Sequence, residues 1–188
     1  MANQITAIIL LQLVFVFITV WLVKSKRSIG NFSLVRKEEW EKHVANNKNL
    51  VSYDTIKLPA RKTARSIGYD IFNTLNSIYL LQPDEEVVIP TGIKVLLGDN
   101  VGLFIIPRSG QGFKYLRLAN TVGLIDPDYY DNQTNNGHIM VKLRNEGPNA
   151  IELKPGVGIA QALFIQTIIT NNDVATDVAR TGGFGSTG

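Results

Sequence analysis

Two aspartates occur where a carboxylate could take part in chemistry. In "NTVGLIDPDYYDN", Asp126 follows the apolar stretch 122–125, which reads as a strand. Its carboxylate is therefore expected at a strand end, in a partly buried place, where it can polarise a water molecule. In "SIGYDIF", Asp70 lies between Tyr69 and Ile71. Taken alone, either aspartate is also typical of an ordinary turn or strand start.

The stretch "IIPRSGQGFKYL" has the composition of an anion site. A buried-looking strand is followed by Arg108, Ser109 and Gly110, and then by residues that suit a short helix. Backbone N–H groups, a hydroxyl and a guanidinium brought together in this way suit phosphate oxygens. A simple strand and turn with a serine cap gives the same pattern, so both interpretations stay open for this stretch by itself.

Two further polar side chains stand out from apolar surroundings. Tyr129 comes shortly after Asp126, and a tyrosine ring can pack against a sugar or a base. In "PGVGIAQALF", Gln161 is the sole polar residue between Ile159 and Ile165. It is either satisfied by backbone groups in the core or placed at a strand end that faces a ligand.

The sequence ends in "ARTGGFGSTG", which is either a frayed terminus or a nucleotide-binding arm. Arg180 can meet a phosphate bidentately, and Phe184 can stack on a ring. The glycines let backbone N–H groups approach an anion, while Ser186 and Thr187 add hydroxyls. A terminus this rich in glycine and serine is usually disordered. Together with the stretches above, however, it favours one ligand with a base, a sugar and several phosphates.

Short apolar segments, bounded by Gly, Pro, Asn or Asp, must position these residues. "EVVIPTGIKVLLG" is interrupted at residues 90–92, and "VGLFIIP", "IMVKLRN", "AIELKPG" and "IAQALFIQTII" follow. Segments this short at this spacing predict an all-β sandwich, jelly roll or barrel. No internal repeat and no βαβ pattern is visible in the sequence.

The front of the chain, residues 1–27, predicts a membrane anchor with a basic flank. Residues 5–23 are apolar apart from two threonines and a glutamine and carry no charge. A helix of this length rises roughly 28 Å, close to the ~30 Å hydrocarbon core of a bilayer. Lys24, Lys26 and Arg27 follow this run, whereas a signal peptide carries its positive charge before it. By the positive-inside rule we expect a single-pass protein whose remaining chain lies in the cytoplasm.

The next segment, residues 28–50, predicts a partly helical tether between the anchor and the β-rich part. Its composition favours a helix, and its apolar positions are sparse. His43 lies in this polar stretch without a ligand-like neighbour in the sequence, so we expect it to be solvated.

The charge is uneven and excludes some functions. Residues 1–50 carry seven Lys and Arg against three Glu, whereas residues 51–188 carry twelve against thirteen Asp and Glu. The larger part therefore has no basic stripe, and duplex nucleic-acid binding is not indicated. The chain has no cysteine, which excludes a disulfide framework and a thiolate metal site.

Over residues 52–188 the five stretches, in this order, resemble the five motifs of the trimeric deoxyuridine triphosphatases (dUTPases). The matching segments are "GYDIF", "PRSG", "GLIDPDY", "GIAQALF" and "RTGGFGSTG". The resemblance implies a distorted jelly-roll β-barrel over residues 51–178 and a flexible arm, 179–188, that closes over the active site. It also implies a homotrimer with active sites shared between subunits. The implied reaction is Mg²⁺-dependent hydrolysis of dUTP to dUMP and pyrophosphate, by water attack at the α-phosphorus.

The resemblance also implies roles for individual residues. Asp126 would activate the attacking water, and Asp70 would reach the Mg²⁺ through water. Tyr129 would pack under the deoxyribose and leave no room for a 2′-hydroxyl. Asn120 and Gly123 would form the uracil pocket. The triphosphate would be held by Arg108, Ser109, Gly110 and Gln161. The closing arm would contribute Arg180, Phe184, Gly185 and Ser186.

Three places depart from the family pattern. The segment 130–138, "YDNQTNNGH", is longer than the family's short turn and is expected to form a longer hairpin tip that carries His138. Arg180 lies four residues before Phe184, one fewer than in the commonest pattern, which leaves its reach open. Gly158 stands where the family often has a charged residue.

Three alternatives stay open at this point. Deoxycytidine triphosphate deaminase shares the implied fold, but it carries a catalytic glutamate on the strand where this sequence has Lys142 and no acid. A regulatory protein could use the fold to sense dUTP at the membrane, binding it without releasing pyrophosphate. Finally, the apolar front could be an artefact of an upstream reading frame, which native protein in the soluble fraction would support.

Overall fold

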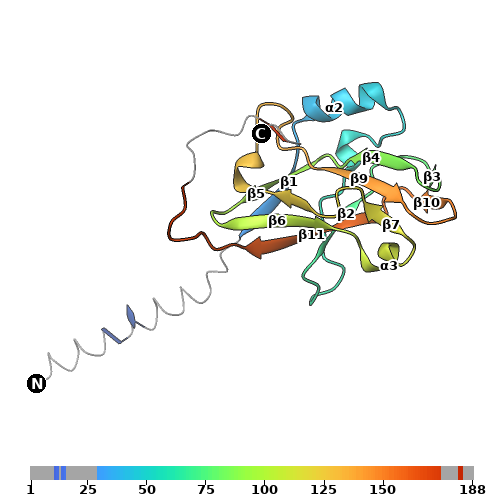
Figure 1. The fold of residues 1–188 in the computed structure, drawn as a ribbon. Coiled ribbons are helices and arrows are strands. Elements are labelled where there is room, and N and C mark those ends of the chain that lie inside the picture. Colours follow the sequence, from blue (N-terminus) through green and yellow to red (C-terminus); the bar gives the residue numbers. More distant parts are fainter. Residues whose placement is uncertain (1–10, 13, 16–28, 175–181, 184–188) are drawn as a thin grey trace, which may run out of the picture.

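The computed structural model describes residues 11–12, 14–15, 29–174 and 182–183 (Figure 1). Most of the predicted anchor, 5–23, lies outside the described residues. The same is true of four residues expected in the arm: Arg180, Phe184, Gly185 and Ser186. Within the part of the chain that is described, no helix is long and apolar enough to cross a membrane.

Short strands are the main regular elements of the described chain (Figure 1). In chain order they are β1 (Gly30–Leu34), β2 (Tyr69–Phe72), β3 (Tyr79–Leu81), β4 (Glu86–Pro90), β5 (Ile93–Leu97), β6 (Val101–Ile106), β7 (Leu116–Leu118), β8 (Gly123–Ile125), β9 (Met140–Asn145), β10 (Ile151–Leu153) and β11 (Gly158–Gln166). The helical elements are α2 (Lys37–Asn46), α3 (Ser109–Gly112) and two single turns, η1 (Tyr53–Thr55) and η2 (Pro127–Tyr129). β4, β5, β6, β9, β10 and β11 coincide with the apolar segments named from the sequence, whereas β1 lies in the segment expected to be a tether. The predicted all-β class is confirmed for the described residues.

All the strand pairs in the described part of the chain are antiparallel. The larger sheet has the order β2-β11-β6-β8, and a second sheet has the order β4-β9-β7. Two further pairs, β1-β5 and β10-β3, complete the described structure. Because β11 pairs with β2 on one side and β6 on the other, it brings three separate parts of the sequence into one register.

One apolar core joins these sheets. Along β9, Val141 and Leu143 are buried while Lys142 is exposed, the alternation expected of a strand with one face in the core. Leu103 of β6 and Ile89 of β4 are fully buried in the same cluster. Burying a side chain of this size contributes about 1.5–3 kcal/mol. The strands that carry the candidate site are therefore held in place by apolar burial.

Residues 30–50 form part of this domain, which differs from the expected tether. β1 pairs with β5 along its whole length. α2 buries Trp40 completely, and the indole N–H donates to the carbonyl of Val51 at 3.2 Å. A tether would have no large apolar side chain to bury, whereas the area of one tryptophan is enough to dock a short helix. The sequence did contain this signal, in Trp40.

Candidate active site

Strand register brings together three residues that the sequence singled out. On β11, Gln161 lies opposite Asp70 of β2 on one side and opposite Ile106 of β6 on the other. Arg108 follows β6 by two residues and turns its side chain back to Asp70. Three motifs that are far apart in the sequence therefore meet at one end of the larger sheet.

The Asp70 carboxylate orients the other two side chains. Its Oδ1 accepts hydrogen bonds from Arg108 Nε at 3.1 Å and from Gln161 Nε2 at 3.0 Å. Asp70 is buried and the other two side chains are half-buried, so this contact is partly shielded from water. Charge-assisted hydrogen bonds of this kind are stronger than neutral ones. The arginine and the glutamine are thus held in fixed positions before any ligand arrives.

Gly158 also holds the side chain of Arg108 in place. Its carbonyl accepts from Arg108 Nη1 and from Gln111 Nε2, both at 3.0 Å. A Cβ added to Gly158 would lie 3.2 Å from the guanidinium carbon, closer than most real Cβ contacts. A glycine here, where the sequence departs from the family pattern, therefore leaves the space that the guanidinium occupies.

A groove of about 590 Å³ opens over these residues. Ser109 and Gly110, at the start of α3, line it together with Arg108. Lys62 and Lys114 add two more cations to the lining. Hydroxyl groups, backbone N–H groups and several positive charges in one groove suit an anion such as a polyphosphate. Neither lysine was singled out from the sequence: Lys62 lies outside the matched motifs, and Lys114 follows the matched "PRSG" within the same quoted stretch.

A second, smaller pocket of about 220 Å³ lies at β8. Asn120 and Gly123, both expected at the uracil pocket, line it with the ring of Tyr129. Ile105 and Met140 add apolar walls. Apolar walls with a few placed polar groups are the usual lining of a site for a ring-shaped ligand.

Asp126 directly follows β8, as the sequence predicted, and is half-buried. Ile125 pairs with Leu103 of β6, so Asp126 comes level with Gly102. Arg108 lies six residues beyond Gly102, which at about 3.3 Å per residue corresponds to roughly 20 Å of extended chain. Among the described residues, the groove and the smaller pocket share no lining residue. Within one chain the expected site residues therefore form two separate groups.

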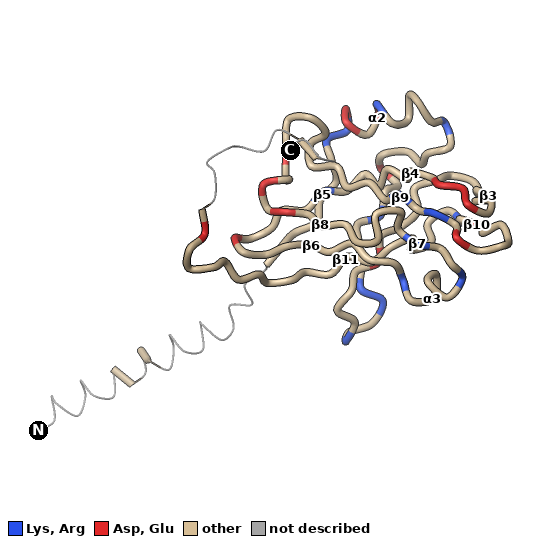
Figure 2. The backbone as a smooth tube through the Cα atoms, viewed as in Figure 1, with Lys and Arg blue, Asp and Glu red and all other residues tan. Residues whose placement is uncertain are grey.

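The charges follow the same separation. Lys and Arg gather on the loop before β2 and around α3, whereas Asp and Glu mark the loops near β8 (Figure 2). The anion groove is thus at the positive end of the larger sheet. The carboxylate expected to activate water is at the other end.

Residues 130–138, called here the asparagine loop, do not form the expected hairpin tip but a loop with several buried side chains. Asn132, Asn135 and His138 are buried, and the loop folds back behind Tyr129. The Tyr129 hydroxyl donates to the carbonyl of His138 at 2.9 Å. A run of polar residues is usually a surface signal, but here the asparagine side chains bond to groups of the loop and of Tyr129, and His138 accepts from the backbone of Gly92. Composition misled for this reason.

Gly183 is one residue of the predicted arm that the structure describes. It lines the smaller pocket. A Cβ added to it would lie 2.5 Å from Cε2 of Tyr129, so only a glycine fits against this ring without a shift. This part of the arm therefore reaches the pocket of its own chain.

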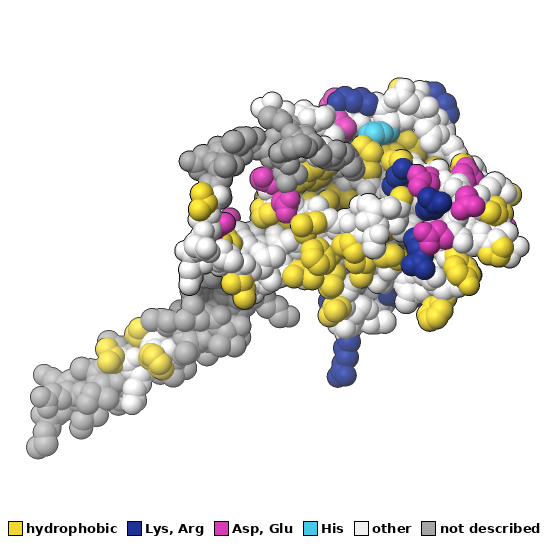
Figure 3. Space-filling model, in the orientation of Figure 1, with side chains coloured by type: hydrophobic (Ala, Val, Ile, Leu, Met, Phe, Trp, Pro, Cys, Tyr) yellow, Lys and Arg dark blue, Asp and Glu magenta, His cyan; other side chains and the backbone are white. Residues whose placement is uncertain are grey.

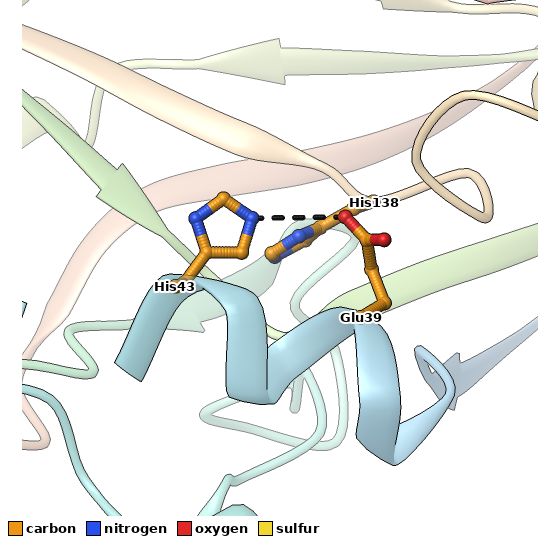
Figure 4. A group of neighbouring side chains, drawn as sticks. All are labelled: Glu39, His43 and His138. Carbon is orange, nitrogen blue, oxygen red and sulfur yellow. Dashed lines mark ion pairs between the residues drawn. The ribbon is translucent and has the colours of Figure 1, made fainter. Parts of the chain in front are cut away.

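Glu39, His43 and His138 come together between α2 and the asparagine loop (Figure 4). Nε2 of His43 lies 3.7 Å from Oε1 of Glu39. The ring of His43 stands edge-on to that of His138, with centroids 4.8 Å apart. His43 is half-buried rather than solvated. This contact could not be predicted, because His43 and His138 are far apart along the chain.

The hydrogen bonding of His138 decides what this cluster can bind. Its Nε2 accepts the backbone N–H of Gly92 at 2.8 Å, so the neutral ring carries its proton on Nδ1. Burial, and then the nearby His43, lower the pKa of His138 to about 3, which keeps the ring neutral at neutral pH. A metal-binding histidine offers a lone pair to the ion and donates its other N–H outward. In His138 the nitrogen that carries the lone pair already accepts from Gly92, so the cluster has the composition of a metal site but His138 has no free lone pair for an ion.

A family model described as dUTPase matches residues 54–188. This stretch contains every expected site residue of the groove and the pocket. The chain belongs to the dUTPase family. It is 37% identical over 137 residues to the deoxyuridine 5′-triphosphate nucleotidohydrolase of Mannheimia succiniciproducens, covering 70% of this chain and 87% of that one. It is 36% identical over 135 residues to that of Lactococcus lactis subsp. lactis, covering 71% and 89%.

A solved structure of the family is also similar. The dUTPase of Streptococcus mutans superposes with a TM-score of 0.59 at 27% identity, covering 76% of this chain and 99% of that chain. The dUTPase-like all-β fold expected from the motifs is therefore confirmed. The family match begins at residue 54, so β1 and α2 lie outside it.

Lys142 bears on the deaminase alternative. It projects from β9 into the lining of the smaller pocket and pairs with Glu86 at 2.5 Å. β9 carries no aspartate or glutamate. The strand on which a related deaminase would carry its catalytic acid therefore offers the pocket a cation.

Proposed function

We propose that the protein hydrolyses dUTP to dUMP and pyrophosphate. The observation that carries this proposal is the dUTPase family match over residues 54–188, which spans both the anion groove and the smaller pocket. Relatives more than a third identical bear the name deoxyuridine 5′-triphosphate nucleotidohydrolase. The lining of the groove suits a triphosphate, and that of the pocket suits a nucleoside.

In this proposal Asp126 acts as the general base. It takes a proton from a water molecule whose oxygen attacks the α-phosphorus. The bond from that phosphorus to the α–β bridging oxygen breaks, and pyrophosphate leaves. Asp126 supports this role as a half-buried carboxylate between Ile125 and Tyr129, which both line the smaller pocket, called the nucleoside pocket from here on. Arg108, Ser109, Gly110 and Gln161 hold the phosphates in the groove.

The smaller pocket selects the base and the sugar. Asn120 and the backbone as far as Gly123 pair with the edge of uracil. Tyr129 packs under the deoxyribose and excludes a 2′-hydroxyl. A small pocket built to pair with one base edge rejects other bases, because its buried polar groups would be left unpaired. The position of all three residues in one lining supports this division of labour.

The active site is shared between copies in a homotrimer. One nucleotide needs its sugar and its phosphates in a single site, but Asp126 and Arg108 lie at opposite ends of β6. A second copy that brings its groove to the nucleoside pocket of the first would unite them. Large exposed apolar residues are available for such contacts, among them Leu124, Phe113 and Ile168. Figure 3 shows hydrophobic side chains gathered on the viewed face, beside a charged strip.

Mg²⁺ is the proposed cofactor. It supplies charge neutralisation on the triphosphate and orients its oxygens, since this ion retains water and prefers phosphate to an all-protein cage. Asp70 fits a contact through water: it is the buried carboxylate beside the groove, and both of its side-chain donors bind the same oxygen, Oδ1.

The arm, residues 179–188, closes over the loaded site in this proposal. Arg180 meets the γ-phosphate, Phe184 covers the uracil, and Gly185 and Ser186 contact the phosphates. The contact of Gly183 with Tyr129 supports an arm that can reach a nucleoside pocket.

Residues 5–23 remain our proposed single-pass anchor, with the catalytic domain in the cytoplasm. The support is the uncharged apolar run followed by three basic residues. Fractionation of the native protein tests it, because an integral anchor resists alkaline carbonate extraction. Release of the full-length chain by carbonate would end this part of the proposal.

The activity is tested by pyrophosphate release with Mg²⁺, offering dUTP, dCTP, dTTP and UTP separately. The protein should be residues 29–188, because β1 and α2 belong to the domain. We expect hydrolysis of dUTP alone. Tight binding of dUTP by a folded oligomer that releases no pyrophosphate would support the sensor alternative instead.

A further inference from the structure

The hydroxyl of Tyr129 is engaged on both sides. It donates to the carbonyl of His138 at 2.9 Å and accepts from the side-chain amide of Asn135 at 2.8 Å. The ring lines the nucleoside pocket, yet Tyr129 as a whole is buried. Two hydrogen bonds at the far end of the ring fix its tilt, because the ring can then rotate or swing only by breaking them.

The asparagines that hold this ring are themselves fixed. Asn132 donates to the backbone carbonyl of Tyr129 at 2.9 Å and to Oδ1 of Asn135 at 2.8 Å. Oδ1 of Asn135 also accepts the N–H of Gly137 at 3.2 Å. This pattern settles which end of the Asn135 amide faces the tyrosine, since the flipped amide would place donors against donors. The backbone carbonyl and the hydroxyl of Tyr129 are thus held by the two buried side chains of Asn132 and Asn135.

Outside contacts anchor the loop to parts of the domain that are distant in sequence. The N–H of Arg36, at the start of α2, donates to Oδ1 of Asn136 at 2.7 Å. Lys94 of β5 forms an ion pair with Asp131. These contacts tie the asparagine loop to β5 and to the N-terminal segment, so the loop moves with the scaffold.

We propose that Asn135, with Asn132, is a specificity-determining positioning residue that sets how strictly the site excludes a ribose. This rests on the proposed function, in which Tyr129 packs under the deoxyribose. The Tyr129 ring excludes a 2′-hydroxyl by steric clash only if the ring cannot move away from it. When hydrogen bonds fix the ring in place, the clash makes UTP bind less well than dUTP. A ring that is free to tilt accommodates the 2′-hydroxyl at little cost in free energy, and selectivity for dUTP is lost.

The experiment compares kcat/KM for dUTP and UTP in the wild-type protein and in Asn135→Ala. We expect the dUTP-to-UTP ratio to fall about tenfold, the scale set by losing a buried hydrogen bond. Gln133→Ala, an exposed position on the same loop, is the control and should keep the wild-type ratio. A purely structural role for Asn135 would lower both activities equally and leave the ratio unchanged, which would overturn the proposal.

Two further variants keep the test decisive if Asn135→Ala does not fold. Asn135→Asp retains an oxygen for Asn132 and Gly137 but removes the donor to Tyr129. Tyr129→Phe keeps the ring and removes the hydroxyl. Each should lower the ratio, and the double variant Tyr129→Phe with Asn135→Asp should lower it no further than either alone. Additive losses would show that the two residues act independently and would refute the inference.

The wild-type measurement separates this inference from the proposed function. A wild-type protein that hydrolyses neither nucleotide, or both equally, refutes the proposed function and the inference with it. Strict dUTP selectivity that survives in Asn135→Asp and Tyr129→Phe refutes the inference alone.

Discussion

The anion groove and the nucleoside pocket are built in different ways. The groove is set by strand register: Asp70, Gln161 and the end of β6 lie in adjacent positions of one sheet. The pocket depends on a turn and a loop, with Tyr129 held by asparagine side chains rather than by a strand ladder. One half of the site thus follows from the sheet, and the other from a few individual hydrogen bonds.

This difference predicts different tolerance to substitution. Strand register is maintained by the burial of many side chains, so no single one decides it. The asparagine loop has no such redundancy. Asn136 and Gly137 take left-handed backbone conformations, with φ of 57° and 73°, and the loop conformation depends on them. We therefore expect changes in the groove to act on substrate affinity, and changes in the loop to act on folding and selectivity.

The largest effect is expected from Asp126→Asn. The amide keeps the shape of the side chain but cannot accept the proton of the attacking water, so kcat should fall by about 10²–10⁴-fold. Binding of dUTP, measured by calorimetry, should persist. Asp128→Asn, two residues further on and exposed, is the matched control. Equal loss in both variants would show that η2 matters structurally and that Asp126 has no special role.

Gly137→Ala should destabilise the fold strongly. The left-handed backbone strains an alanine, and the new Cβ would lie 2.9 Å from the carbonyl oxygen of Tyr129. We expect the free energy of unfolding to fall by about 2–4 kcal/mol. Gly112→Ala is the control, because a Cβ there meets nothing within 4 Å. Urea unfolding that shows equal stability for the two variants would remove the special status of the loop.

The groove was the more predictable half of the site. "PRSG" and the lone Gln161 were visible in the sequence because a short run of polar residues between apolar strands is a local signal. Their meeting with Asp70 required only that the strands pair. The strand segments themselves followed from apolar periodicity. What could not be read was the contribution of Lys62 and Lys114, whose approach depends on loop conformation.

The loop and the N-terminal segment were less predictable, for a shared physical reason. A polar side chain that bonds to buried backbone has the same sequence signal as one that faces water. Asn132 and Asn135 therefore looked like a surface turn, and His43 looked solvated. Trp40 did carry a readable signal, because a tryptophan amid charges needs apolar contact. This signal indicates a segment that packs on the domain, but we expected a tether there, which differs from the structure.

Acid should lower the free energy of unfolding through His138 of the asparagine loop. The pKa of His138 falls from 6.5 to about 3 on folding, mainly through burial and then through His43. The unfolded chain therefore binds a proton below pH 6.5 that the folded chain does not. The free energy of unfolding should thus fall as the pH drops from 6.5 toward 3, by up to about 1.4 kcal/mol per pH unit from this group.

Urea unfolding at pH 7, 6 and 5 checks this dependence. His138→Asn should show a shallower decline than the wild-type protein, because it removes the titrating group. Glu39 and His43 face the same ring, so His43→Gln is the companion variant and should retain most of the slope. Parallel curves for the wild-type protein and His138→Asn would mean that other groups set the acid sensitivity.

The smallest effect is expected in the groove, from Gly158→Ala. The added Cβ would lie 3.2 Å from the guanidinium of Arg108, and the carbonyl that binds this side chain stays in place. The arginine must therefore shift by a few tenths of an ångström, a strain of about 0.5–1.5 kcal/mol. We expect KM for dUTP to rise by about 2–10-fold with kcat little changed, since the positioning of the phosphates is affected and that of the attacking water is not.

Gly102→Ala, where the new Cβ makes an ordinary contact, is the control and should leave KM unchanged. A fall in thermal stability without a change in KM would instead place Arg108 among the residues that hold the sheet together, and the groove would lose its resemblance to a preformed phosphate site.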